Sequence, residues 1–137
     1  MKQLQDRVAI VTGASKGIGK AIARAFAMEG ASVMIAARDR PALDAVTSEI
    51  ARDGGAVLAI PTDITLEADV VALFKAAVDR HGRLDILVNN AGITLGMWRS
   101  TIVMRVITSS FSVAIREMRS RPVRFLRAKC WGIAGRP

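Results

Sequence analysis

A group of glycines directly after an apolar stretch constrains the fold of this chain more than any other sequence feature. Residues 8–12 are apolar enough for a buried strand, and Gly13, Gly17 and Gly19 follow with the spacing G-x-x-x-G-x-G. Apolar residues then recur at helical spacing as far as Gly30, where a helix would stop. The glycines are therefore predicted to connect a strand to the N-terminus of a helix.

This position gives the glycines a chemical role. Backbone without Cβ atoms can come close to a pyrophosphate group, and a helix N-terminus directs unpaired N–H groups toward its negative charge. A glycine-rich turn without a ligand is the alternative, but it requires the strand, the helix and the later motifs to coincide by chance. The arrangement predicts a dinucleotide-binding site.

Strands and helices alternate along the first ninety residues. Further strands are predicted at 32–37, 56–60 and 84–88, a second helix from about Pro41 to Gly54, and a third that stops near Gly82. This alternation is typical of an α/β fold, a Rossmann-like parallel sheet with helices on both faces. With about four strands, the sheet is predicted to be incomplete.

In order and spacing, residues from 5 to about 96 resemble the short-chain dehydrogenase/reductase family. The resemblance is carried by the glycine spacing, by Asp63-Ile64 after the third strand and by Asn89-Asn90-Ala91-Gly92 after the fourth. It implies an NADP(H)-dependent oxidoreductase that acts on an alcohol or carbonyl group. The residues that it assigns to cofactor binding are Gly13, Ser15, Lys16, Gly17, Ile18, Gly19, Arg38, Asp63, Ile64, Asn90, Ala91 and Gly92.

The end of the second strand indicates which cofactor would bind. An acidic residue there would bond a ribose 2′-hydroxyl and repel a 2′-phosphate, but the chain has Ala37 followed by Arg38. In the resembled family, Lys16 adds a second cation on the same side of the ribose. Together these residues favour NADP over NAD. The alternative is that both are ordinary solvated charges, since Asp39 could partly neutralise Arg38.

The catalytic part of the resembled family has no counterpart in this sequence. The family uses Tyr-x-x-x-Lys to move a proton at the carbonyl oxygen, but the 137 residues include no tyrosine. Ser109 and Ser110 come too early to be the family's strand-five serine. No catalytic residue is therefore predicted, and negligible turnover is expected. The alternative function is a non-catalytic dinucleotide-binding remnant or a basic-tail interaction module.

Charge divides the chain into a dinucleotide-binding half-domain, 1–96, and a basic tail, 97–137. The first has 11 basic and 11 acidic residues, and the second has 9 and 1, so the net charge of +8 lies in the tail. The favoured explanation is out-of-frame translation, with an irregular structure. A nucleic-acid-binding extension is disfavoured because Pro122 interrupts the arginines. A membrane-surface segment is disfavoured because its apolar residues do not share one helical face.

An incomplete sheet would expose the edge of the strand at 84–88, which predicts self-association or marginal stability. The tail could supply a replacement strand, for which 102–108 is β-prone. Nothing in the sequence indicates a signal peptide or a membrane span, and the single cysteine predicts a reducing cytoplasm. His81 alone gives no basis for a metal site.

Overall fold

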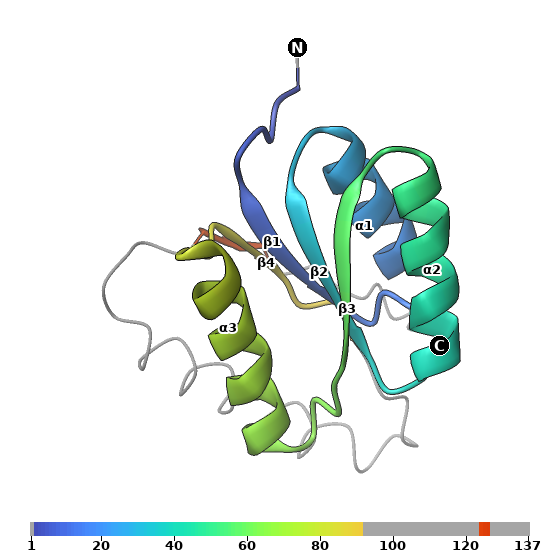
Figure 1. The fold of residues 1–137 in the computed structure, drawn as a ribbon. Helices are drawn as coiled ribbons and strands as arrows, with labels where there is room; N and C mark the ends of the chain where they lie inside the picture. Colours follow the sequence, from blue (N-terminus) through green and yellow to red (C-terminus); the bar gives the residue numbers. More distant parts are fainter. Residues whose placement is uncertain (1, 92–123, 127–137) are drawn as a thin grey trace, which may run out of the picture.

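The described part of the chain is a parallel sheet with helices on both faces (Figure 1). The computed structural model describes residues 2–91 and 124–126. The elements in chain order are β1 (Val8–Thr12), α1 (Gly17–Met28), β2 (Ser32–Ala37), α2 (Arg40–Arg52), β3 (Ala56–Pro61), α3 (Glu67–His81), β4 (Ile86–Val88) and β5 (Arg124–Leu126). The strands lie in the order β3-β2-β1-β4-β5, which confirms the predicted α/β class.

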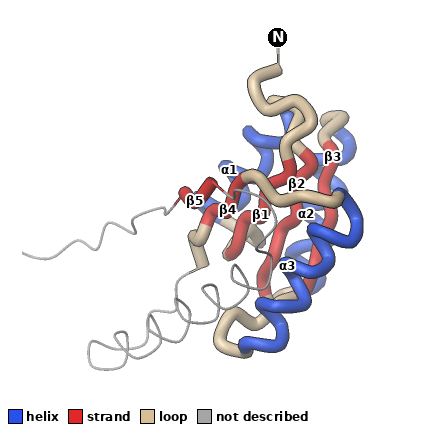
Figure 2. Tube along the Cα trace, turned by 90° about the vertical axis from the view of Figure 1, so that its left-hand side faces the viewer, coloured by secondary structure: helices blue, strands red, loops and turns tan. Residues whose placement is uncertain are grey.

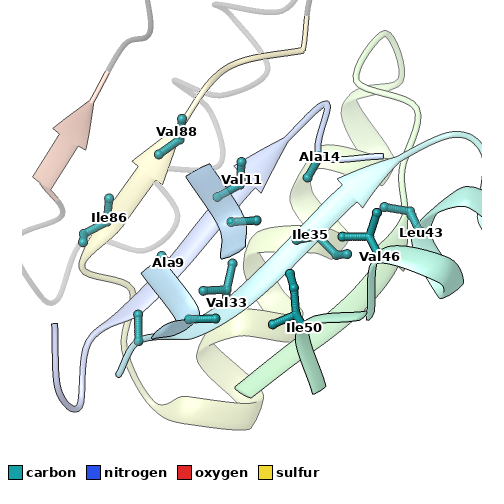
Figure 3. Close-up of a cluster of buried hydrophobic side chains, with 13 residues drawn as sticks. Ala9, Val11, Ala14, Val33, Ile35, Leu43, Val46, Ile50, Ile86 and Val88 are labelled. Carbon is teal, nitrogen blue, oxygen red and sulfur yellow. The ribbon is translucent and has the colours of Figure 1, made fainter. Parts of the chain in front are cut away.

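Strand β1 lies between two apolar cores because its side chains alternate between the faces of the sheet. Val8 and Ile10 belong to the cluster that contains Leu73 and Phe74 of α3. The other faces of β1 and β2 belong to the cluster that includes helices α1 and α2 (Figure 3). All five residues of β1 are buried, as expected for a central strand covered on both sides.

Helices α1 and α2 pack on one face of the sheet, and each begins at its carboxyl edge. Asp39 caps α2 by accepting a hydrogen bond from the backbone N–H of Ala42 at 3.1 Å. The buried side of α1 consists of small residues, Gly19, Ala23 and Ala27, so this helix lies close to the sheet. Ile18, although apolar, is 71% exposed.

The prediction that the fourth strand lies at an exposed edge is wrong. Strand β4 pairs with β1 on one side and with β5 on the other (Figure 2), in a register that joins Ile86 to Arg124 and Val88 to Leu126. Strand β5 comes from the part of the chain that was predicted to be irregular. The predicted replacement strand, 102–108, lies outside the described residues. Self-association stays a prediction, and in the described sheet the edge beyond β4 is that of β5.

A buried carboxylate fastens the amino end of β4 to β1. Asp85 is 8% exposed and accepts a hydrogen bond from Val8 N at 2.9 Å and one from Arg7 Nη1 at 3.3 Å. It also accepts two from Arg83, one of them from Nε at 2.8 Å. Burial raises the pKa of Asp85, but the hydrogen bonds from Arg83 and Val8 outweigh it, so the pKa lies below its ordinary value.

Replacing this carboxylate should make the protein less stable at neutral pH. Asp85→Asn is expected to lower the free energy of unfolding by about 2 kcal/mol at pH 7, because it removes the charged hydrogen bonds of the carboxylate. The loss should be no larger because both arginines are partly exposed, so solvent screens the ion pairs. The folded-state pKa is depressed, so this stabilisation is present above the unfolded value of about 3.9 and is lost as pH falls through the folded one. Urea unfolding from pH 7 to pH 3 measures it.

The difference between parent and variant should therefore shrink in acid. Asp79→Asn is the control, because its ion pair with Lys75 is well exposed and its removal should change stability little. Equal stabilities of parent and Asp85→Asn at pH 7 would contradict the role given to this carboxylate.

Candidate cofactor-binding site

A cleft of about 840 Å³ lies at the carboxyl edge of the sheet. Its walls come from the segments that follow four neighbouring parallel strands, which is where open α/β sheets bind ligands. The lining residues are Gly13, Ser15 and Lys16 after β1, Ala36, Ala37, Arg38, Asp39 and Ala42 at the end of β2 and the start of α2, Thr62, Asp63 and Ile64 after β3, and Asn90 and Ala91 after β4.

Two glycines allow backbone to approach backbone in one corner of this cleft. Gly13 has φ of +65°, and a Cβ atom there would lie 2.8 Å from the Cα atom of Ala91. A Cβ atom on Gly19 would lie 2.3 Å from the carbonyl oxygen of Gly13. Neither position has room for a side chain, and the N-terminus of α1 is therefore held close to the loop after β1. This cradle suits a pyrophosphate group.

Thr12 connects this corner to the end of β4. Its buried hydroxyl accepts hydrogen bonds from the backbone N–H groups of Asn90 at 3.1 Å and Ala91 at 3.0 Å, and it lies 3.4 Å from the carbonyl oxygen of Val88. The side-chain amide of Asn90 donates to the carbonyl oxygen of Gly13 at 3.3 Å. The loops after β1 and β4 thus form one hydrogen-bonded unit.

Two cations, Lys16 and Arg38, line the cleft. Both side chains are exposed, and within residues 2–91 neither forms an ion pair. Asp39, the residue that could have neutralised Arg38, accepts the capping hydrogen bond of α2 instead. The neighbouring Arg40 pairs with Asp44 at 2.8 Å on α2. The electrostatics of the cleft therefore suit an anionic group beside Arg38.

The wall after β3 is a tight turn around Asp63. One oxygen of its carboxylate, Oδ1, accepts from the backbone N–H of Thr65 at 2.9 Å and from the hydroxyl of Thr65 at 2.7 Å. The backbone N–H of Asp63 donates to Asp69 at 2.8 Å. The hydrogen bonds from Thr65 outweigh burial and hold the pKa of Asp63 below its ordinary value, with a smaller contribution from the charge of Arg38.

The structure brings most of the sequence-predicted residues together. Those that line the cleft are Gly13, Ser15, Lys16, Arg38, Asp63, Ile64, Asn90 and Ala91. The first turn of α1 contains Gly17, Ile18 and Gly19, which are not among the lining residues of the cleft. Gly92 lies outside the described residues.

Sequence reasoning missed Thr12 and several lining residues that have small side chains. The missed residues include Ala36 and Thr62, near the ends of strands, and Ala42, near the start of a helix. Because such ends meet at the carboxyl edge of a parallel sheet, these residues could have been predicted to line the cleft. Thr12 could have been found because a polar residue closing a buried strand needs a hydrogen-bond partner.

Neither a metal site nor a membrane-spanning helix is found among the described residues. No group of three or more His, Cys, Asp or Glu side chains within them could hold a metal ion, and His81 is in the last turn of α3. None of the three described helices is long and apolar enough to cross a membrane.

The comparisons with known proteins agree with this geometry. The family model for short chain dehydrogenase matches residues 7–118, which extends past the resemblance found in the motifs. An uncharacterized oxidoreductase of Methylorubrum extorquens is 46% identical over 94 residues, which cover 68% of this chain and 38% of that protein. A 3-oxoacyl-[acyl-carrier-protein] reductase of Synechocystis is 40% identical over 116 residues, covering 84% and 45%.

Comparison with a solved structure shows that the fold is shared as well. A metagenomic short-chain oxidoreductase in complex with NADP superposes with a TM-score of 0.74 at 32% identity, covering 90% of this chain and 62% of that one. The chain spans less than half the length of the two curated relatives. On the family-model match, the identities and the shared fold, the chain belongs to the short-chain dehydrogenase family.

Proposed function

We propose that the cleft binds NADP(H) and that this chain is the cofactor-binding part of an oxidoreductase acting on an alcohol or carbonyl group. The observation that carries the proposal is a pair of cations in the cleft, Lys16 and Arg38, that form no ion pair within residues 2–91. Ala37 stands at the end of β2, where an acidic residue would disfavour a 2′-phosphate. The metagenomic relative was solved with NADP, which supports the same choice.

Each wall of the cleft has a part in the proposed binding. The backbone around Gly13 and the first turn of α1, Gly17, Ile18 and Gly19, would hold the pyrophosphate. Lys16 and Arg38 would pair with the 2′-phosphate. The remaining proposed contacts are Ser15 beside the glycine loop, Asp63 and Ile64 toward the adenine, and Asn90 and Ala91 on the adenosine side. Gly92, also predicted to bind the cofactor, lies outside the described residues.

When bound, the cofactor supplies or accepts hydride, whereas the residues of this chain bind and orient it. The proton at the carbonyl oxygen would need a further group, and the sequence has no tyrosine for that purpose. This absence favours a second candidate, a dinucleotide-binding protein without turnover of its own. The proposed setting is a reducing cytoplasm, because the sequence has one cysteine. No nucleic-acid partner is proposed.

Titration of the 137-residue chain with NADPH and NADH tests the cofactor. Arg38→Ala should weaken NADPH binding about tenfold, the loss expected for a charged hydrogen bond, and should leave NADH binding unchanged. Arg40→Ala is the matched control. Arg40 lies two residues after Arg38, pairs with Asp44 and is not among the lining residues of the cleft. Fluorescence of the reduced nicotinamide measures both dissociation constants.

Two outcomes would contradict the proposal in different ways. If the parent chain bound NADPH and NADH equally, the argument from Arg38 would fail while dinucleotide binding would stand. If it bound neither, the cleft would not be a cofactor site in this chain.

A further inference from the structure

The cleft contains carboxylates as well as cations, and their arrangement decides whether Arg38 is available to a ligand. Asp39 and Asp63 both line the cleft together with Arg38 and Lys16. A carboxylate that paired with Arg38 would compete with any bound phosphate, because both bind the same guanidinium N–H groups. Yet among the described residues Arg38 has no ion pair with either.

Local hydrogen bonds hold one oxygen of each carboxylate. Asp39 is held by the N-terminus of α2, through the N–H of Ala42. Asp63 is held by Thr65, which offers both its backbone N–H and its hydroxyl to the same oxygen, Oδ1. The hydroxyl contact is the shorter of the two, 2.7 Å against 2.9 Å. Each carboxylate therefore bonds within its own turn.

We propose that Thr65 is a positioning residue that sets the coenzyme preference, because it holds Asp63 in the turn after β3 and so leaves Arg38 free for the 2′-phosphate. This inference rests on the proposed function. Thr65 is not among the lining residues of the cleft, and it acts through Asp63.

Asp63 and Arg38 line the same cleft, so a carboxylate that left its turn could compete for the guanidinium. Asp63 and Arg38 lie on neighbouring walls of one cleft, and the charge of Arg38 contributes to the lowered pKa of Asp63. A carboxylate released by Thr65 would gain by moving toward the guanidinium, and the resulting ion pair would have to break when the 2′-phosphate binds. NADH has no 2′-phosphate, so its binding would not bear that cost. The ratio of the two affinities thus reports on Thr65.

The test compares Thr65→Val, Thr65→Ser and a control, Thr47→Val, in the full chain. Valine keeps the shape of threonine but has no hydroxyl, and we expect the preference for NADPH over NADH to fall about fivefold, the effect of an ion pair worth about 1 kcal/mol. Serine restores the hydroxyl and should restore the preference. Thr47 also uses its hydroxyl locally, toward the carbonyl of Leu43 on α2, and its replacement should leave the ratio unchanged.

The Asp63→Ala background separates this role from general support of the turn. Without the carboxylate, Thr65→Val should no longer change the ratio, whereas a merely structural role would weaken both coenzymes alike in either background. Thermal melting checks that each variant folds, and Thr65→Ala replaces the valine variant if that one does not melt cooperatively.

The outcomes are distinguishable from failure of the proposed function. A parent chain that bound NADPH and NADH equally would overturn the proposed preference for NADP(H), and this inference with it. A parent that prefers NADPH, combined with Thr65 variants of unchanged preference, would overturn the role of Thr65 alone.

Discussion

Gly19→Ala should abolish NADPH binding and lower the free energy of unfolding by about 3 kcal/mol, the upper end for overpacking a tight site. The new Cβ atom would lie 2.3 Å from the carbonyl oxygen of Gly13 and 2.6 Å from the side-chain amide of Asn90. Since the first of these is a backbone atom, the clash is relieved only if α1 moves away from the loop after β1. That movement would open the corner proposed for the pyrophosphate.

Gly82→Ala is the control for this substitution. Gly82 ends α3 with φ of +69°, and a Cβ atom there would have no neighbour within 4 Å. Its replacement should cost only the strain of the left-handed conformation, about 1 kcal/mol, and leave NADPH binding intact. Urea unfolding and NADPH titration of both variants make the comparison. Intact binding in Gly19→Ala would show that the close approach is not needed for the site.

The positions of the first three strands and of the helices were predictable because burial imposes simple periods on the sequence. A strand covered on both faces is apolar throughout, as β1 is, and α2 repeats its buried residues at helical spacing between a capping Asp39 and a terminal glycine. The predicted boundaries were accordingly close. The fourth strand is shorter than predicted because its paired register with β1 begins at Ile86, after the buried residues Leu84 and Asp85.

Strand β5 could not be predicted because its position depends on a partner distant in sequence. Three residues, Arg124–Leu126, pair with β4 across a gap of more than thirty residues. So short a segment has no period of its own, and parallel pairing is decided by the register of the neighbouring strand rather than by local propensity. The sequence instead pointed to 102–108, where β-prone residues are concentrated.

Residues of the candidate site could be predicted where the chemistry of binding requires a particular residue type. They could not be predicted where a residue's role depends on which group the fold places beside it. Glycines beside a helix start, or a cation after a strand, suggest a role whatever surrounds them. Thr65 suggests no such role by itself, and Thr12 indicates only that it needs a hydrogen-bond partner. Their roles follow from the groups to which their hydroxyls bond, Asp63 for one and the end of β4 for the other, and neither bond can be inferred from spacing.

Thr12→Val should destabilise the protein by about 3 kcal/mol and weaken NADPH binding. Valine fills the same volume but cannot accept the hydrogen bonds from the N–H groups of Asn90 and Ala91. A buried polar group left without a hydrogen-bond partner costs about 1 to 3 kcal/mol. Asn90 and Ala91 are only partly buried, so each lost hydrogen bond should cost an amount in the lower half of that range, which gives about 3 kcal/mol for the two. Urea unfolding measures the loss of stability.

The binding effect follows from the same bonds. Without Thr12, the turn of Asn90 and Ala91 is no longer fixed to β1, and Asn90 would not be held against Gly13. Thr12→Ser keeps the acceptor and should retain most of the stability and affinity. Thr47→Val removes a hydroxyl that only donates to the carbonyl oxygen of Leu43 on the same helix, and it should cost far less. If Thr12→Val were as stable as Thr12→Ser, the two N–H groups would have found other acceptors. The hydroxyl would then not be what joins the loops of β1 and β4.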